Sequence, residues 1–374
     1  MALQVSILHI FGRMVRGGAE MRTLEIMRYM DRSRFRFCFV ALSGLPGELD
    51  EEIRSLGGEV FHLQLRSACF PWRFKELIRR EKITAVHSHV HLFSGFLLAL
   101  ARSEKVPVRI AHFRSMRDGT RTGIRRRCQN QLMRYWTDQH ATNILAVCEG
   151  AMATAWDPTW RGDPRCEVIY NGLDLAPFGK PQDREGVRRE FGLSPSSRLC
   201  IHVGRMVEAK NHPRLIAIFR HLSREIDDSV LLLVGRGERG PEDRLRQMVR
   251  EFGLGERVIF AGERTDVPRL LKASDLLLFP SLWEGLPGII LECCAAGLPA
   301  LATDLPGIRE IQAWFPDLVE VLSLQSADEG WAAAAAALLQ SPKPRAYSVP
   351  DLFQGTPFRL EVAGERLSRI WVNR

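Results

Sequence analysis

The sequence has no run of about 20 consecutive apolar residues, the length that a membrane-spanning helix requires. Its longest run of small apolar residues, 332–339, is much shorter. The first ten residues contain no basic leader and are more typical of a β-strand than of a secretory signal. We therefore expect a cytoplasmic protein that is at most peripheral at the inner face of a membrane.

The sequence also lacks any C-x-x-C pair, although it contains 8 cysteines. The scattered cysteines are typical of reduced thiols in a core, and they exclude both a disulfide scaffold and the usual zinc-ligand spacing. We expect no bound metal and no cofactor.

The chain has 374 residues and a formal net charge of +8. This length fits two domains better than one. The positive charge admits nucleic acid, an anionic membrane face or a phosphorylated substrate as partners. No helix-turn-helix, zinc or RNA-binding motif is present, so nucleic acid is the least favoured of the three.

Short β-type segments alternate with helical patterns along the whole chain, which is typical of a parallel α/β architecture. The expected strands are 5–10, 36–42, 84–88, 109–113, 144–148 and 167–170, followed by 199–204, 230–235, 258–262, 276–280 and 299–303. The turn-rich segment 171–198 separates the two series. We expect Rossmann-like domains at 1–170 and 171–356, each with a doubly wound parallel sheet, and a C-terminal helix within 357–374. Two such sheets that face each other would bind a ligand at the carboxyl ends of their strands.

The most distinctive local pattern joins two glutamates, Glu284 and Glu292, across Leu286-Pro287-Gly288. Pro287 suits the start of a helix, which places Glu284 in the loop before it. Eight helical residues span about 12 Å, too far for the paired carboxylates of a glycosidase. The spacing suits two carboxylates that hold hydroxyls at opposite ends of a nucleotide-sugar, with backbone amides at the helix N-terminus near its phosphates. The alternative is a capping Glu284 and a solvated Glu292.

Two cations, Arg205 and Lys210, lie between an expected strand and a helix that begins near residue 213. Such a pair can neutralise a diphosphate, on which charge develops as it leaves. The alternative is two surface cations.

Gly17-Gly18 follows the first strand, and His89 follows the third. Paired glycines at a helix N-terminus allow close approach of an oxyanion. His89 would enter the ligand site if its strand ends one or two residues before it, whereas an ordinary glycine turn and a core histidine are the alternatives.

The segment Gly235-x-Gly237-x-x-Gly240 also matches the glycine pattern of dinucleotide-binding proteins, with Glu263 at the position of a ribose ligand. It follows the second strand of its domain rather than the first, so we keep an NAD-type oxidoreductase or epimerase only as an alternative.

The stretch 121–136 is basic and contains Arg121, Arg125, Arg126, Arg127 and Arg134 but no acidic residue. Neutral or apolar residues recur through it at helical spacing. This pattern predicts either an amphipathic helix on an anionic membrane or a solvated charged face.

Taken together, the motifs resemble glycosyltransferase family 4 of the GT-B fold. The resemblance extends from Gly17-Gly18-Ala19-Glu20 through 86–89, 169–174 and 203–212 to 279–304. It is most similar to the branch that serves exopolysaccharide and capsule assembly. The sequence departs from the family at Cys293-Cys294, at Leu305-Pro306-Gly307 and throughout 312–355.

The resemblance implies that the domain at 1–170 binds the acceptor, that the domain at 171–356 binds the donor, and that the C-terminal helix packs back on the first domain. It also implies a role for each motif. Glu284 would bind the donor sugar and Glu292 the ribose, Arg205 and Lys210 would hold the diphosphate, and His89 would lie beside the transferred sugar. Gly17 and Gly18 would face the phosphates, and Leu286, Pro287 and Gly288 would line the donor site. The backbone near Glu263 and Arg264 would meet the base.

The function implied is a retaining, metal-independent transfer of a hexosyl-type sugar from a nucleotide-diphosphate sugar, UDP- or GDP-linked, to a glycan or lipid-linked acceptor. The leaving phosphate would help deprotonate the acceptor. A non-catalytic nucleotide-sugar binding protein is a further alternative. The sequence names neither the base, the sugar nor the acceptor.

Overall fold

The computed structural model describes residues 4–116, 123–181, 183–237, 239–341 and 348–373. It divides the chain into two compact units, which are described separately here. Unit 1 comprises Met1–Asp174 and Pro357–Arg374, and unit 2 comprises Leu175–Thr356. The domain boundary expected from the sequence, between residues 170 and 171, thus lies four residues before the boundary between the two units.

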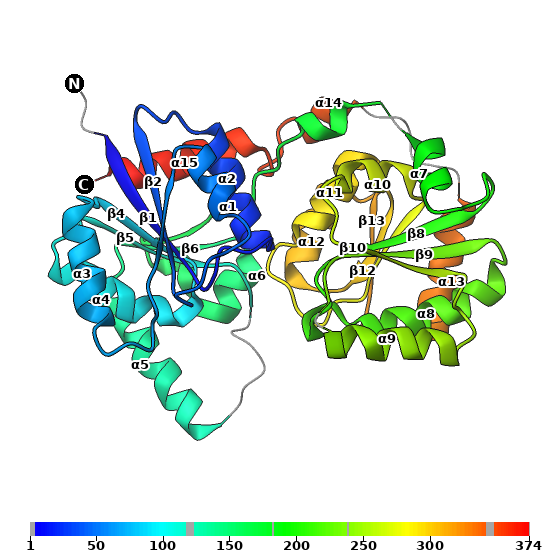
Figure 1. Cartoon of the computed structure of the whole chain (residues 1–374), viewed down its shortest axis with the longest axis horizontal. Coiled ribbons are helices and arrows are strands. Elements are labelled where there is room, and N and C mark those ends of the chain that lie inside the picture. The colour runs from blue at the N-terminus through cyan, green and yellow to red at the C-terminus, as the bar shows by residue number, and fades with distance from the viewer. Residues whose placement is uncertain (1–3, 117–122, 182, 238, 342–347, 374) are drawn as a thin grey trace. The chain divides into compact units, whose positions relative to one another are not determined.

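Unit 1 is built on a fully parallel seven-stranded sheet with the order β3-β2-β1-β4-β5-β6-β7. Its strands are β1 (Val5–Phe11), β2 (Phe35–Ala41), β3 (Glu59–His62), β4 (Ala85–Ser88), β5 (Val108–Phe113), β6 (Asn143–Ala146) and β7 (Cys166–Val168). Its helices are α1 (Gly18–Tyr29), α2 (Asp50–Ser55), α3 (Phe70–Arg80), α4 (Ser94–Ser103), α5 (Ile124–His140), α6 (Glu149–Ala151) and α15 (Leu360–Val372). Helices α1, α2 and α15 lie on one side of this sheet, and α3, α4 and α5 lie on the other (Figure 1).

Unit 2 has a parallel six-stranded sheet with the order β10-β9-β8-β11-β12-β13. Its strands are β8 (Arg198–Val203), β9 (Ser229–Val234), β10 (Val258–Gly262), β11 (Leu276–Phe279), β12 (Ala300–Thr303) and β13 (Val319–Leu322). Its helices are α7 (Arg184–Glu190), α8 (His212–Glu225), α9 (Arg239–Glu251), α10 (Val267–Ala273), α11 (Gly288–Ala296), α12 (Pro306–Gln312), α13 (Asp328–Gln340) and α14 (Val349–Phe353).

Each unit has its own apolar core. In unit 1, the early strands pack against Leu367, Ile370 and Trp371 of α15, so residues from both ends of the chain share one core. In unit 2, α8 packs against α13, where Trp331 is fully buried. The alanine-rich stretch 332–339 is therefore part of a core helix, because small side chains let α13 approach α8 closely.

The doubly wound α/β fold predicted from the sequence is confirmed, and every expected strand is present with ends that differ by at most two residues. Two edge strands, β3 and β13, were not expected. Both are short and partly exposed, so they lack the apolar run that marks the buried strands. Among the described residues, no helix is long and apolar enough to cross a membrane.

Candidate functional site

In unit 2, the strand order reverses between β8 and β11, which pair side by side. In open α/β sheets, ligands bind at such a switch point, beyond the carboxyl ends of the strands. The loop after β8 contains Arg205 and Lys210, and the loop after β11 contains Glu284. The fold thus brings three residues singled out in the sequence to one edge of one sheet.

Lys210 and Glu284 are in direct contact. The Lys210 ammonium Nζ donates to Glu284 Oε1 at 2.6 Å, and both side chains are largely buried. The same Nζ lies 4.6 Å from the centre of the Phe279 ring, a cation–π contact. A side chain at position 204 would press against the Lys210 methylenes, so Gly204 leaves room for this arrangement.

Backbone contacts fix the loop that carries Lys210. The amide of Leu282 donates to Ala209 O at 2.8 Å, and Asn211 Nδ2 donates to Pro280 O at 3.1 Å. Asn211 has a left-handed backbone with a φ of 52°, a conformation that asparagine tolerates better than most residues. The loops after β8 and β11 therefore hold each other, and Lys210 is positioned before any ligand binds.

The other residues of the expected donor site surround this pair. The Arg205 side chain is exposed and has no hydrogen-bond or ion-pair partner within the described part of the chain. Glu284 lies in the loop, as predicted, and Pro287 is the N-cap of α11 rather than its first residue. Leu286 is buried, and Gly288 begins the helix. Glu292 lies one turn further along α11 and is half-buried.

Arg264 is committed to an ion-pair network. Its guanidinium contacts Glu190 at 2.7 Å and Asp266 at 2.8 Å. The hydrogen bonds that Arg264 donates to these two carboxylates raise the pKa of its guanidinium above the ordinary value, and they lower the pKa of Asp266 to about 2. The expected contact between a base and the backbone near Glu263 and Arg264 stays a prediction.

In the segment that matches the dinucleotide-binding pattern, local packing requires the first glycine, Gly235. Gly235 follows β9 with a φ of 139°, and any side chain there would collide with the carbonyl of Gly204. Gly235 therefore lets the loop after β9 pack on the loop after β8. This packing accounts for Gly235 without a dinucleotide.

Unit 1 also has a switch point, between β1 and β4, where His9 pairs with His87. His89 follows the end of β4, as the sequence predicted, and its ring stacks on Phe11 with 4.3 Å between ring centres. Gly17 and Gly18 stand at the N-terminus of α1, directly after the loop that follows β1.

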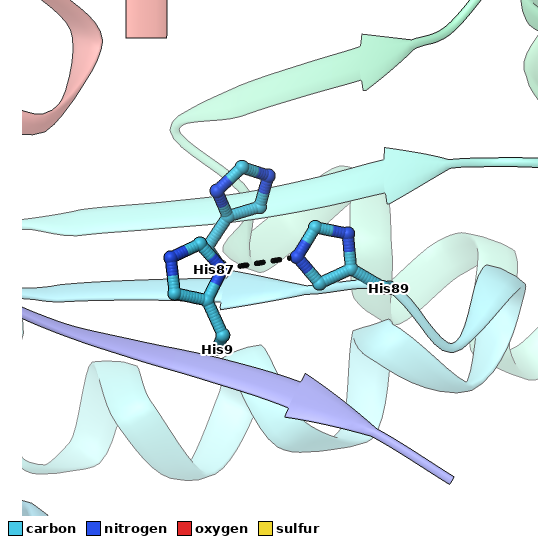
Figure 2. Close-up of side chains that lie close together, drawn as sticks. All are labelled: His9, His87 and His89. Atoms are coloured by element: carbon cyan, nitrogen blue, oxygen red, sulfur yellow. Dashed lines mark hydrogen bonds between the residues drawn. The ribbon is translucent and has the colours of Figure 1, made fainter. Parts of the chain in front are cut away.

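Four histidines of unit 1 form two hydrogen-bonded pairs, His9 with His89 and His87 with His112. Figure 2 shows His9, His87 and His89 and the hydrogen bond between His9 and His89. Arg114 Nε donates to His89 Nδ1 at 3.2 Å, so a neutral His89 carries its proton on Nε2 and donates it to His9 Nδ1 at 3.1 Å. Similarly, Trp371 Nε1 donates to His87 Nδ1 at 3.3 Å, and His87 Nε2 donates to His112 Nδ1 at 2.9 Å. A His89 ring nitrogen must exchange a protein partner before it can bind a ligand.

All four imidazoles are held neutral. Burial, followed by the charge of Arg114, lowers the pKa of His9 to about 3. Burial is likewise the largest cause that lowers the pKa of His87, His89 and His112 well below the ordinary value. The cluster therefore acts through fixed hydrogen bonds rather than through charge.

His9, His87 and His89 each offer a nitrogen, and the three nitrogens lie within 4.8 Å of one another. That spacing alone would admit a metal ion. However, the Arg114 guanidinium donates to one of the three rings, and two of the rings share a hydrogen bond. A dication there would stand beside a cation, so the donor set does not fit a resident metal.

A cavity of about 650 Å³ lies within unit 1, between α5 and the loops that follow its first strands. Its walls combine apolar and polar side chains, including two arginines. They are formed by Gly12, Leu42, Ser43, Gln64, Leu65, Arg66, Val90, Phe93, Arg126, Gln129, Asn130 and Met133.

The basic stretch forms α5, and its arginines face different ways. Arg125 and Arg127 are exposed, whereas Arg126 lines the cavity. Arg134 is half-buried, with its guanidinium 5.3 Å from the Trp156 ring centre and a hydrogen bond to Ala155 O. Arg121 lies outside the described residues. The outer face of α5 also exposes Ile124, Leu132 and Tyr135, by 81%, 47% and 60% respectively.

Sequence reasoning missed His9, His112, Arg114 and Trp371 as site residues. A signal for three of them was available. His9 and His112 interrupt apolar strands, and Arg114 directly follows the strand that contains His112. Trp371 gave no such signal, because only the fold brings it next to His87.

Family models match both units. The model described as Glycosyltransferase Family 4 matches residues 16–177, and the model for glycosyl transferases group 1 matches residues 183–347. The chain belongs to the family 4 glycosyltransferases and has the GT-B type of fold.

Two curated relatives match most of their length. The capsular polysaccharide biosynthesis glycosyltransferase CapH of Staphylococcus aureus is 27% identical over 99% of both chains. EpsF of Bacillus subtilis strain 168, a glycosyltransferase by designation, is 31% identical over 91% of this chain and 90% of its own. Among solved structures, Anabaena HepE in complex with UDP-glucose has a TM-score of 0.79 and 17% identity, over 98% of this chain and 99% of HepE.

Proposed function

We propose that the protein is a retaining glycosyltransferase of cell-surface polysaccharide synthesis. It moves a hexosyl-type sugar from a UDP- or GDP-linked donor to a glycan or lipid-linked acceptor. The observation that carries this proposal is the contact of Lys210 with Glu284 at the switch point of unit 2, beside an exposed Arg205. The capsular role of CapH and the UDP-glucose bound to HepE support the pathway and the donor class.

Each residue has a part in this reaction. Arg205 and Lys210 neutralise the leaving diphosphate, Glu284 accepts hydrogen bonds from the donor sugar, and Glu292 accepts them from the ribose. The sugar C1–O bond to the phosphate breaks while the acceptor oxygen bonds to C1 on the same face. The acceptor proton passes to the leaving phosphate, so the protein supplies no nucleophile and no metal is needed.

The cavity of unit 1 offers a place for the acceptor, because Arg66 and Arg126 line it together with apolar side chains. A lipid-linked acceptor would be reached at an anionic membrane surface, with the outer face of α5 against the lipid.

The test is a thermal-shift screen of the whole chain with UDP, GDP, ADP, CMP, NAD and the matching nucleotide-sugars. One nucleoside diphosphate at 100 times its Kd should stabilise the protein by about 2.7 kcal/mol. Glu292→Ala and Lys210→Ala should lose this shift and all turnover while they remain folded. The exposed Glu256→Ala and Lys180→Ala serve as controls that keep both.

Full turnover in either site variant would contradict the assignment. Stabilisation by NAD alone would favour an oxidoreductase or epimerase. Stoichiometric binding of a nucleotide-sugar without hydrolysis or transfer to any acceptor would instead indicate a binding protein.

A further inference from the structure

Arg114 directly follows β5. Its side chain contacts residues from three other segments of unit 1. Its guanidinium donates to His89 Nδ1 at 3.2 Å, to Asn171 Oδ1 at 2.9 Å and, at 3.4 Å, to Thr23 Oγ1 on α1. All three acceptors are neutral, because the His89 imidazole is uncharged. These contacts fix the guanidinium in place but do not balance its charge.

Two other partly buried arginines of unit 1, Arg36 and Arg165, have carboxylate partners, whereas Arg32 and Arg109 donate to backbone carbonyls. Arg36 pairs with Glu59 and Glu81, and Arg165 pairs with Asp138 and Asp163. Within the described residues, no carboxylate lies within ion-pair distance of Arg114, and Glu20 acts on it only through a longer-range charge interaction. Burial lowers the pKa of the Arg114 guanidinium to about 10, which is the cost of holding this charge without a counterion.

The guanidinium has hydrogen-bonding capacity left. It carries five N–H groups, of which one on Nε, one on Nη1 and one on Nη2 are used inside the protein. One N–H on each of Nη1 and Nη2 therefore remains, the fork that suits two oxygens of one phosphate. The contact with Thr23 holds one edge of the guanidinium against α1.

We propose that Arg114 is a phosphate-binding residue of unit 1, and that the phosphate belongs to the acceptor. This proposal rests on the proposed function, in which the donor diphosphate is held by Arg205 and Lys210 of unit 2. The acceptor class that follows is a phosphorylated one, such as a glycan linked to a lipid through phosphate. Arg114 then supplies the counter-charge for the acceptor and Asn171 and His89 hold Arg114 in position.

The first experiment measures binding of inorganic diphosphate to the full chain by calorimetry, in an Arg205→Ala/Lys210→Ala background that removes the donor cations. Diphosphate should still bind, and adding Arg114→Gln should weaken this binding by about tenfold or more, the loss expected for a charge-assisted hydrogen-bond pair. Arg73→Gln, which removes an exposed cation from α3 of the same unit, should leave the binding unchanged within about twofold. If the background variant binds no diphosphate, or if Arg114→Gln binds it equally well, the proposal is wrong.

The second experiment separates the two sources of phosphate. Arg114→Gln in the otherwise native chain should raise KM for a phosphate-bearing acceptor by about tenfold or more and leave the affinity for the nucleoside diphosphate unchanged. A rise confined to the donor KM would assign the phosphate to the donor and overturn the acceptor claim. Failure of the wild-type chain to bind any nucleoside diphosphate would instead refute the proposed function, while the first experiment would still decide on Arg114.

Arg114→Lys covers the case in which the glutamine variant does not fold. It keeps the positive charge but loses the fork, so we expect a folded protein with diphosphate affinity between those of the native and glutamine side chains. If Arg114→Lys binds diphosphate as tightly as the protein with the native arginine, then the two guanidinium N–H groups do not bind the phosphate together.

Discussion

Lys210 and Glu284 neutralise each other across 2.6 Å. A diphosphate must compete with the Glu284 carboxylate for the Lys210 ammonium. Glu284→Gln should therefore bind the free nucleoside diphosphate several-fold more tightly, by about 1 kcal/mol, and yet lose sugar transfer. Calorimetry measures the affinity for the nucleotide, and a turnover assay measures sugar transfer. Weaker nucleotide binding in Glu284→Gln would mean that the glutamate orients Lys210 rather than competes for it.

Gly235 and Gly240 belong to the same glycine pattern but occupy different environments. A methyl group at position 235 would collide with Gly204 O on a backbone with positive φ, whereas one at position 240 meets nothing within 4 Å. We expect Gly235→Ala to lower the free energy of unfolding by about 2–5 kcal/mol and Gly240→Ala to leave it nearly unchanged. Chemical denaturation of both variants checks this, and equal effects would contradict the packing role of Gly235.

At the scale of elements, α5 has an apolar stripe on its outer face, formed by Ile124, Leu132 and Tyr135, with the exposed Arg125 and Arg127 nearby. We expect the protein to bind anionic vesicles, and we expect the binding to weaken strongly as salt is raised from low to physiological concentration. Arg125→Glu/Arg127→Glu should abolish it, and Ile124→Ser/Leu132→Ser should weaken it without changing its salt dependence. Arg73→Glu, at an exposed position on α3, is the charge control.

Vesicle sedimentation at two salt concentrations measures this binding. Salt-independent binding, or equal binding to neutral vesicles, would refute an electrostatic role for α5. Loss of binding in the Arg73→Glu control would show that only the net charge matters.

For the whole molecule, buried neutral histidines make stability depend on pH. The pKa of His9 is lowered to about 3 and that of His212 to about 4, and His87, His112 and His202 lie well below the ordinary value, in every case chiefly because of burial. In the unfolded chain these groups titrate near 6.5, so the unfolded state binds more protons below that pH. Their contribution is fully present above about pH 6.5 and is lost as the pH falls toward the folded values.

Each such histidine should cost about 1.4 kcal/mol per pH unit below about 6.5. Urea unfolding at pH 7, 6 and 5 should therefore show a drop of several kcal/mol between pH 6 and 5, above the range in which carboxylates titrate. Unit 1, which holds His9, His87 and His112, should unfold at less acid pH than unit 2. A free energy of unfolding that is constant from pH 7 to 5 would show that these imidazoles are protonated in the folded state.

The sequence predicted the parts of this molecule that are encoded locally. The loop positions of Glu284 and Lys210 follow from strand ends and from Pro287, all within short segments, whereas their contact was not predicted. The histidine network does not, because it joins β1, β4, β5 and α15, and one of its hydrogen bonds spans 284 residues. The place of Arg114 after β5 was a local signal, but its environment of neutral acceptors exists only once residues 23, 89 and 171 have come together.

The return of α15 to unit 1 also constrains the order in which the chain can fold as it is synthesised. Unit 2 is continuous and is inserted between the two segments of unit 1. The first strands made must therefore wait for Trp371 to fill their core, while all of unit 2 can fold before that residue leaves the ribosome. The unit that begins synthesis first is thus the unit that completes its core last, and until then its apolar strands need protection from aggregation.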